Sequence, residues 1–215
     1  MDALRAAIGL TPLAAYLFIL GLINFSKRPQ LRSGARDLAA LGVALAGLVL
    51  VGPIELLMPT IFVAEFGPYA WGLALAIYAS GWSLFVLSTA PRLVAYNIDA
   101  DRFRLLVAET ALAMDSDAHW AGDSVVLPQR GIQGRIESFP ILRNASLVSN
   151  GPRQDFTAWG DLEKNLRRSL ETVEVQRNPR GGLMLALSLM IVIALVVKWA
   201  MDDKFGQAFV DMIGL

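Results

Sequence analysis

The sequence predicts an α-helical integral membrane protein, in which four transmembrane helices carry one small inserted α+β domain. Two observations lead to this fold class. The composition is 55% hydrophobic and only 18% charged, which is more apolar than an ordinary soluble domain. The apolar residues also gather in four runs that are long enough for a helix to cross a bilayer, which takes about 20 residues. We therefore divide the chain into a membrane domain at 1–90, an α+β domain at 91–180 and a last membrane segment at 181–215.

The four apolar runs are the predicted transmembrane helices, at about 7–25, 38–58, 69–90 and 183–200. A cleaved signal peptide is the alternative for the first run. That run is long, no small-x-small cleavage site precedes Lys27, and basic residues follow the run instead of preceding it. We expect a retained helix.

Lysine and arginine residues near the ends of the runs predict the orientation, because short cytoplasmic loops are enriched in them. The loop at 59–68 has Glu65 and no basic residue, and the C-terminal tail is net acidic. Basic residues lie at the other ends of the runs, namely Lys27, Arg28, Arg32, Arg36, Arg92, Arg177 and Arg180. The expected topology places both termini outside and residues 91–180 in the cytoplasm, in a cell inner membrane of bacterial type.

The lipid bilayer is the first expected partner, since anionic headgroups attract basic clusters at the cytoplasmic surface. A solvated helix face together with the orientation signal explains the same basic residues equally well. A formal net charge of zero, from 19 basic and 19 acidic residues, gives no indication of nucleic acid as a partner. The candidate headgroup contacts are Arg28, Arg32, Arg177 and Arg180.

Small residues at four-residue spacing predict where the helices pack, because transmembrane helices associate through close backbone approach. Gly42 and Ala46 share one face of the second run, beside Gly47. The third run carries Gly72, Ala76 and Ser80 on one face. A short loop joins the two runs, so we expect these faces to meet within one chain. A dimerisation motif is the alternative.

Glu55 is the acidic residue at membrane depth, close to the predicted outer surface. Pro53 lacks a backbone donor and should kink or loosen the helix just before it. An ionisable group in a membrane segment is a functional candidate because its burial is costly. Contact with interfacial water, or capping of a broken helix, explains Glu55 as well.

Residues 91–180 have the patterning of a folded α+β unit. A turn signal stands at 128–131, and the segment at 132–138 alternates apolar and polar residues. Strands are expected at 93–98, 124–127, 132–138 and 145–149, with a further edge strand at 173–175. With two helices in this order, the unit approximates a split β-α-β arrangement of the ferredoxin-like kind with an extra strand. The open sheet face is expected to pack on the basic loop after the first run, on headgroups or on another protein.

Two soluble helices are expected in this unit, each with an apolar stripe. The first begins near Asp101, with Asn97 and Asp99 as capping residues, and buries Phe103, Leu106, Val107, Ala111 and Met114. The second spans about 154–172 and buries Phe156, Trp159, Leu162, Leu166 and Leu170. The tail at 204–215 has the spacing of a short interfacial helix, and a docking segment for a partner subunit would look the same.

The residue types exclude most cofactor chemistry. Without a cysteine the chain has no disulfide, iron–sulfur or thiolate zinc site. His119 is the only histidine, so a bis-histidine haem within one chain is excluded. Its aspartate-rich surroundings at 115–123 invite an acid–base or metal role, although a solvated loop accounts for them better. The segment at 131–134 lacks the spacing of a phosphate loop. We therefore expect no cofactor and no metal.

Three classes of function remain open. The first is a non-catalytic accessory, scaffold or assembly subunit of a larger membrane complex, whose partners are other membrane subunits or a second copy of the chain. The second is a small oligomeric transporter or channel that uses Glu55. The third is a membrane-bound sensor whose cytoplasmic domain binds a ligand. An enzyme is the least favoured, because the only acid–base cluster is the poor one around His119.

Overall fold

The computed structural model of the chain describes residues 3–57, 64–67, 69–151 and 154–202. Its residues form two compact units. The helical unit comprises Met1–Ile19, Leu38–Leu87 and Met184–Leu215, and the sheet unit comprises Leu20–Asp37 and Ser88–Leu183. The predicted interfacial tail at 204–215 and the end of the second apolar run at 58 lie outside the described residues.

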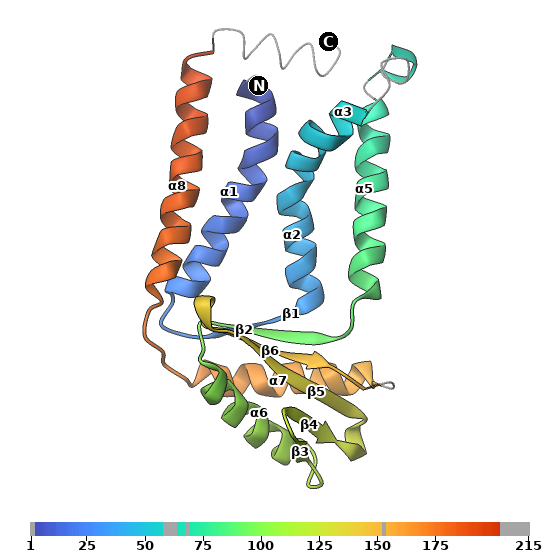
Figure 1. The fold of residues 1–215 in the computed structure, drawn as a ribbon, viewed down its shortest axis with the longest axis vertical. Coiled ribbons are helices and arrows are strands. Elements are labelled where there is room, and N and C mark those ends of the chain that lie inside the picture. The colour runs from blue at the N-terminus through green and yellow to red at the C-terminus, as the bar shows by residue number, and fades with distance from the viewer. Residues whose placement is uncertain (1–2, 58–63, 68, 152–153, 203–215) are drawn as a thin grey trace. The chain divides into compact units, whose positions relative to one another are not determined.

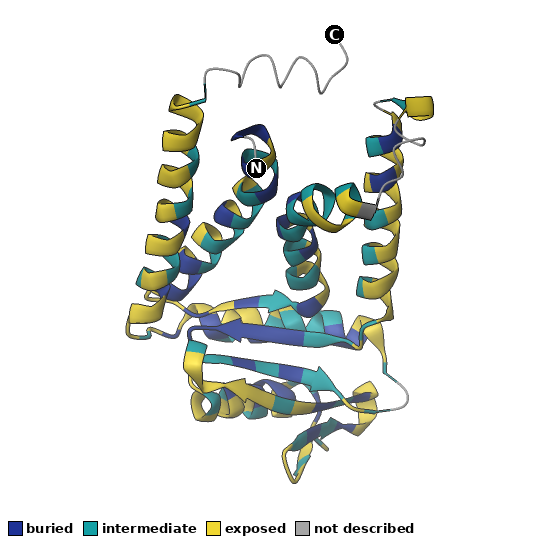
Figure 2. Cartoon of the chain, turned by 45° about the horizontal axis from the view of Figure 1, so that its top comes forward, coloured by how far each residue is buried: buried dark blue, intermediate teal, exposed yellow. Residues whose placement is uncertain are grey.

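Four helices of the described chain are long and apolar enough to cross a membrane, as the hydropathy predicts. A multi-pass membrane protein is thereby supported by length and composition (Figure 1). Most residues of α5 and α8 are exposed in the single chain, which suits contact with lipid (Figure 2). The four spans are α1 (Ala3–Phe25), α2 with its continuation (Gly34–Ile54), α5 (Tyr69–Ser88) and α8 (Pro179–Ala200).

The second span changes its winding at Pro53. Helix α2 (Gly34–Val49) passes into a π-helix, η1 (Leu50–Ile54), and then into the short α3 (Glu55–Leu57). Proline has no amide hydrogen and its ring clashes with the preceding turn, so the hydrogen-bond ladder widens there. The expected loosening before Glu55 is therefore present as a π turn.

Helices α2 and α5 contact each other through two side-chain donors one turn apart. The Tyr78 hydroxyl donates to the Gly42 carbonyl oxygen at 2.7 Å, and the indole N–H of Trp82 donates to the Leu38 carbonyl oxygen at 2.9 Å. A Cβ atom on Gly42 would overlap the Trp82 ring. The absence of a side chain at Gly42 therefore makes room for Trp82 of α5, and Gly42 does not meet a second small residue there.

The small-residue face of α5 is not the face that contacts α2. Gly72, Ala76 and Ser80 are all exposed, whereas Gly42 is buried and Ala46 half-buried. The two small faces therefore do not meet within the chain, because the bulkier Tyr78 and Trp82 supply hydrogen bonds that small side chains lack. A packing role for the exposed face stays a prediction.

Helix α1 contacts both of its neighbours in the helical unit. A Cβ atom on Gly47 of α2 would overlap the backbone carbonyl oxygen of Ile8. The Ser188 hydroxyl of α8, itself buried, donates to the Ala14 carbonyl oxygen at 2.8 Å. Close backbone approach at small residues is the usual basis of helix association in membranes.

The sheet unit contains an antiparallel six-stranded sheet in the order β1-β2-β6-β5-β4-β3. Helices α6 (Ala100–Met114) and α7 (Phe156–Glu171) supply apolar residues to one core with the sheet. The strands are β1 (Gln30–Ser33), β2 (Arg92–Tyr96), β3 (His119–Ala121), β4 (Ser124–Leu127), β5 (Ile132–Phe139) and β6 (Asn144–Ser149).

The four strands predicted within 91–149 are present, and so are both helices. Two further strands were not expected: β1 lies in the basic loop after the first span, and β3 contains His119. The basic loop thus extends the sheet at its edge, where Leu31 pairs with Ala95, instead of covering a face. The segment at 173–175 is not a strand, and Val175 only donates its amide to the Lys27 carbonyl oxygen at 2.9 Å.

A ferredoxin-like arrangement is not confirmed by this sheet. In a split β-α-β unit, a crossover helix joins two parallel strands that have one antiparallel strand between them. Here α6 leads from β2 to β3, and three strands, β4, β5 and β6, lie between these two. Because α6 reaches the far edge of the sheet, the chain returns to β2 by a meander from β3 to β6.

The soluble helices confirm most of their predicted buried residues and correct three details. Phe156 is 75% exposed, because it is the first residue of α7 and its Cβ tilts back past the helix start. Asp99 occupies the N-cap position of α6 but makes no capping bond, since it pairs with Arg143 at 3.1 Å. Asn97 has φ 57° and donates its side-chain amide to the Ser26 carbonyl oxygen at 2.7 Å.

Candidate functional site

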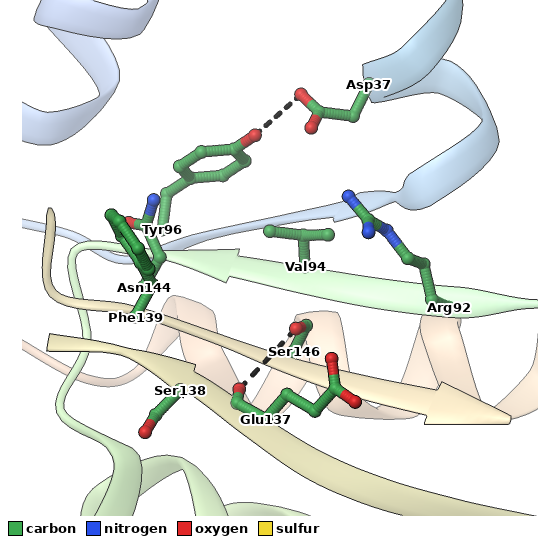
Figure 3. A pocket seen from close by; sticks show the side chains of 9 residues that line it. All are labelled: Asp37, Arg92, Val94, Tyr96, Glu137, Ser138, Phe139, Asn144 and Ser146. Atoms are coloured by element: carbon green, nitrogen blue, oxygen red, sulfur yellow. Dashed lines mark hydrogen bonds between the residues drawn. The ribbon is translucent and has the colours of Figure 1, made fainter. Parts of the chain in front are cut away.

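A polar pocket of ≈ 310 Å³ lies within the sheet unit, on the face of the sheet opposite α6 and α7. Residues alternate between the two faces of a strand. In β2, Leu93 and Ala95 enter the core with the helices, while Arg92, Val94 and Tyr96 project from the other side (Figure 3). Strands β5 and β6 and the start of α2 complete the lining, with Asp37, Glu137, Ser138, Phe139, Asn144 and Ser146.

Arg92 forms one wall of the pocket, and Gly34 makes space for its side chain. A Cβ atom on Gly34 would overlap the aliphatic stem of Arg92. The Arg92 Nε atom is buried and has no hydrogen-bond partner. Among the described residues no carboxylate makes an ion pair with its guanidinium. Such a buried donor is costly while it lacks an acceptor.

Asp37 faces the same pocket from the first turn of α2, where the dipole of the helix N-terminus stabilises its negative charge. The Tyr96 hydroxyl donates to Asp37 Oδ1 at 2.6 Å (Figure 3). Tyr96 and Val94 also pack with Ile23 at the end of α1. This contact fixes Tyr96, and Tyr96 in turn orients the carboxylate.

The remaining polar groups come from β5 and β6. Glu137 forms an ion pair with Arg135 at 2.6 Å, and the Ser146 hydroxyl donates to the Glu137 carbonyl oxygen at 3.5 Å. The Asn144 side-chain oxygen accepts the Asn97 amide at 3.4 Å, which leaves the two N–H groups of its side chain available. The pocket thus presents one guanidinium, two carboxylates and neutral hydrogen-bonding groups.

This arrangement is suited to binding. A cavity of ≈ 310 Å³ falls at the lower end of the range for small-molecule sites. Within the described residues no group of three or more histidine, aspartate or glutamate side chains is placed to hold a metal ion. The lining offers hydrogen-bond donors, acceptors and charges of both signs to a small polar molecule.

Glu55, the intramembrane candidate, forms an ion pair with Arg5. The distance from Arg5 Nη2 to Glu55 Oε1 is 2.6 Å, and the two side chains are 52% and 27% exposed. Arg5 precedes the apolar run at 7–25, so hydropathy alone gave no reason to place it beside Glu55. The pair offsets the charge of Glu55 within the helical unit.

A double-mutant cycle on this pair is expected to give a coupling of only about 0.2–1 kcal/mol, because partly exposed ion pairs are weak. Arg5→Gln, Glu55→Gln and the double variant would be unfolded in detergent beside the wild type. A coupling energy of several kcal/mol would contradict this expectation and indicate that the pair is desolvated in the folded protein.

His119 lies exposed on β3, at one edge of the sheet, and its Nδ1 atom is 2.9 Å from the Asp117 carbonyl oxygen. The nearby Asp115 is buried and has a structural task. Its two oxygens accept the backbone amides of Asp117 and Gln129, each at 2.9 Å. These bonds use the Asp115 carboxylate to hold the loop, so the aspartate-rich segment has a structural explanation.

The four arginines predicted to contact headgroups all belong to the sheet unit. Arg28 is exposed and Arg32 half-buried in β1. The Arg177 guanidinium lies 5.0 Å from the centre of the Phe25 ring, and the Arg180 guanidinium donates to the Ile141 carbonyl oxygen. Headgroup contact stays a prediction for all four.

No protein-family model, curated protein or solved structure matches the chain. The sequence pattern did not indicate the pocket, because its lining comes from 37, 92–96 and 137–146. One signal was present in β2, where a basic and an aromatic residue, Arg92 and Tyr96, share the face opposite Leu93 and Ala95.

Proposed function

We propose that the chain is a non-catalytic accessory, scaffold or assembly subunit of a larger membrane protein complex. The observation that supports it is the exposed small-residue face of α5, formed by Gly72, Ala76 and Ser80. A Cβ atom on Gly72 would meet nothing within 4 Å. Small residues at this spacing allow a second helix to approach closely in lipid.

The other glycines at helix contacts strengthen this proposal. Gly42 and Gly47 each lie where a Cβ atom would overlap a neighbouring helix, and Gly181 approaches the backbone of Asn24 and Phe25 in the same way. Close approach at glycine thus recurs at several helix contacts of this chain. A helix from a partner subunit, or from a second copy, would give the Gly72 face the neighbour that the other glycines already have.

The proposed location is a cell inner membrane of bacterial type, with both termini outside and residues 91–180 in the cytoplasm. The loop charges support it, since Lys27, Arg28, Arg32 and Arg36 follow the first span while the loop between α2 and α5 carries Glu65. In this orientation the sheet unit is accessible to soluble partners.

The test is purification of the chain from its native membranes in mild detergent. The wild type is expected to retain a partner subunit or a second copy, and Gly72→Leu to lower that retention at least roughly tenfold by blocking close approach. Gly81→Leu is the matched control, because Gly81 also has open space around it and lies about 180° around the helix from Gly72. A wild type that purifies as a lone monodisperse monomer would contradict the proposal.

A membrane-bound sensor is the second candidate, and the pocket beside Arg92 and Asp37 favours it. A ligand in that pocket would contact β2 and the first turn of α2 together. The Glu55-dependent transporter is a third proposal with less support, because Arg5 already pairs with Glu55. It requires that Glu55→Gln lower ion flux in reconstituted vesicles, and unchanged flux would rule it out.

A further inference from the structure

The pocket of the sheet unit is tied to the ends of two membrane spans by the chain itself. Asp37 lies in the first turn of the second candidate span, and Arg92 follows within a few residues of Ser88, the last residue of α5. The ends of spans lie at the polar headgroup region of a bilayer. Connectivity alone therefore holds these two lining residues near lipid headgroups.

Arg92 lacks an acceptor that a ligand can supply. Its Nε atom is buried without a partner, and its guanidinium has no ion pair among the described residues. A guanidinium binds phosphate or carboxylate oxygens through two parallel N–H bonds, which are among the strong hydrogen bonds of proteins. An anionic oxygen in the pocket would remove the cost of the unsatisfied donor.

The two carboxylates specify the rest of the ligand. Tyr96 donates to one oxygen of Asp37, and carboxylates can accept several further bonds. The lining holds one guanidinium, that of Arg92, and two carboxylates, those of Asp37 and Glu137, and Arg135 next to the pocket pairs with Glu137. A dianion alone would be repelled by the carboxylates, whereas a ligand with both an anion and an ammonium group satisfies both sides.

We propose that this pocket binds a phosphoethanolamine group. Arg92 takes the phosphate, and Asp37 and Glu137 take the ammonium. The Asn144 amide donates to the remaining phosphate oxygen, and the hydroxyls of Ser138 and Ser146 lie among the same lining groups. The volume of ≈ 310 Å³ accommodates a group of this size.

The same chemistry occurs in a phosphatidylethanolamine lipid and in free phosphoethanolamine. Position favours the lipid, because the pocket is tied to two span ends. The exposed ring of Phe139, which also lines the pocket, gives the glycerol or acyl part an apolar contact. The inference rests on the pocket and is independent of the proposed accessory role.

The experiment measures binding to the purified full-length chain in detergent by titration calorimetry. The probes are a short-chain phosphatidylethanolamine, its phosphatidylcholine counterpart, free phosphoethanolamine and inorganic phosphate. If the phosphatidylethanolamine binds more tightly than free phosphoethanolamine, the ligand is the lipid headgroup. If free phosphoethanolamine binds more tightly, the ligand is a soluble molecule. Equal binding of all four probes, or of none, would overturn the proposal.

The variants test the assigned residues. Arg92→Gln is expected to weaken binding of the preferred probe roughly tenfold or more, because a charge-assisted pair of bonds is lost. Arg168→Gln is the matched control, since it makes the same charge change on an exposed position of α7. Asp37→Asn is expected to abolish the preference for ethanolamine over choline. Equal losses in Arg92→Gln and Arg168→Gln would show non-specific charge attraction and contradict the assignment.

Discussion

Replacing Gly47 with leucine is expected to destabilise the helical unit strongly. A Cβ atom at this position would overlap the carbonyl oxygen of Ile8 and lie against the Cα atom of Gly9. Both neighbours are backbone atoms, so α1 must move as a whole to admit a side chain. Overpacking against side chains already costs about 1–3 kcal/mol. We therefore expect the thermal midpoint of the full chain in detergent to fall by at least roughly 5 °C.

Gly81→Leu controls for the change of residue type in a membrane helix. Gly81 belongs to α5, and a Cβ atom there would meet nothing within 4 Å. Its midpoint should stay within about 1 °C of the wild type, because surface changes away from special features have little effect. Equal losses in the two variants would show that α1 and α2 do not approach each other at Gly47.

Replacing Phe103 with alanine is expected to open the core of the sheet unit. Phe103 is 0% exposed and packs in one cluster with Val107, Leu162 and Leu166. Truncating a fully buried phenylalanine to alanine costs about 3–5 kcal/mol, because the contacts are lost and a cavity remains. Amide hydrogen exchange in α6, α7 and the strands should accelerate roughly 100- to 5,000-fold.

Phe156→Ala makes the same chemical change at a residue that is 75% exposed. It should leave the exchange rates of the sheet unit within a factor of about two, because exposed positions rarely change stability by more than ~0.5 kcal/mol. A large effect of Phe156→Ala, or no effect of Phe103→Ala, would contradict the assignment of Phe103 to the core and of Phe156 to the surface.

The hydropathy of the chain was sufficient to predict the four spans, because a bilayer imposes a simple requirement of length and apolarity. Alternation and helical stripes likewise predicted β4, β5, β6 and both soluble helices. The two missed strands carried too little local signal. Strand β1 has one buried residue, Leu31, in a basic loop, and it exists because it pairs with β2 far along the chain. Strand β3 has three residues, of which none is buried.

Pairings between distant residues were the part that the sequence did not predict. Arg5 meets Glu55, and Trp82 meets Gly42, through packing of helices that are separate in the chain. The pocket joins Asp37 to Arg92 through the hydrogen bond of Tyr96 and the pairing of β1 with β2. Each of these contacts depends on tertiary structure, which a single sequence pattern does not encode locally.

The most direct test of the four-span arrangement uses single cysteines, which is convenient because the chain contains none. Glu65→Cys lies between the second and third spans, and Arg102→Cys lies in α6 of the sheet unit. In spheroplasts of a bacterial expression host, a membrane-impermeant maleimide is expected to label Glu65→Cys, and to reach Arg102→Cys only after the membrane is opened. Labelling of both positions from the same side would contradict the four-span arrangement.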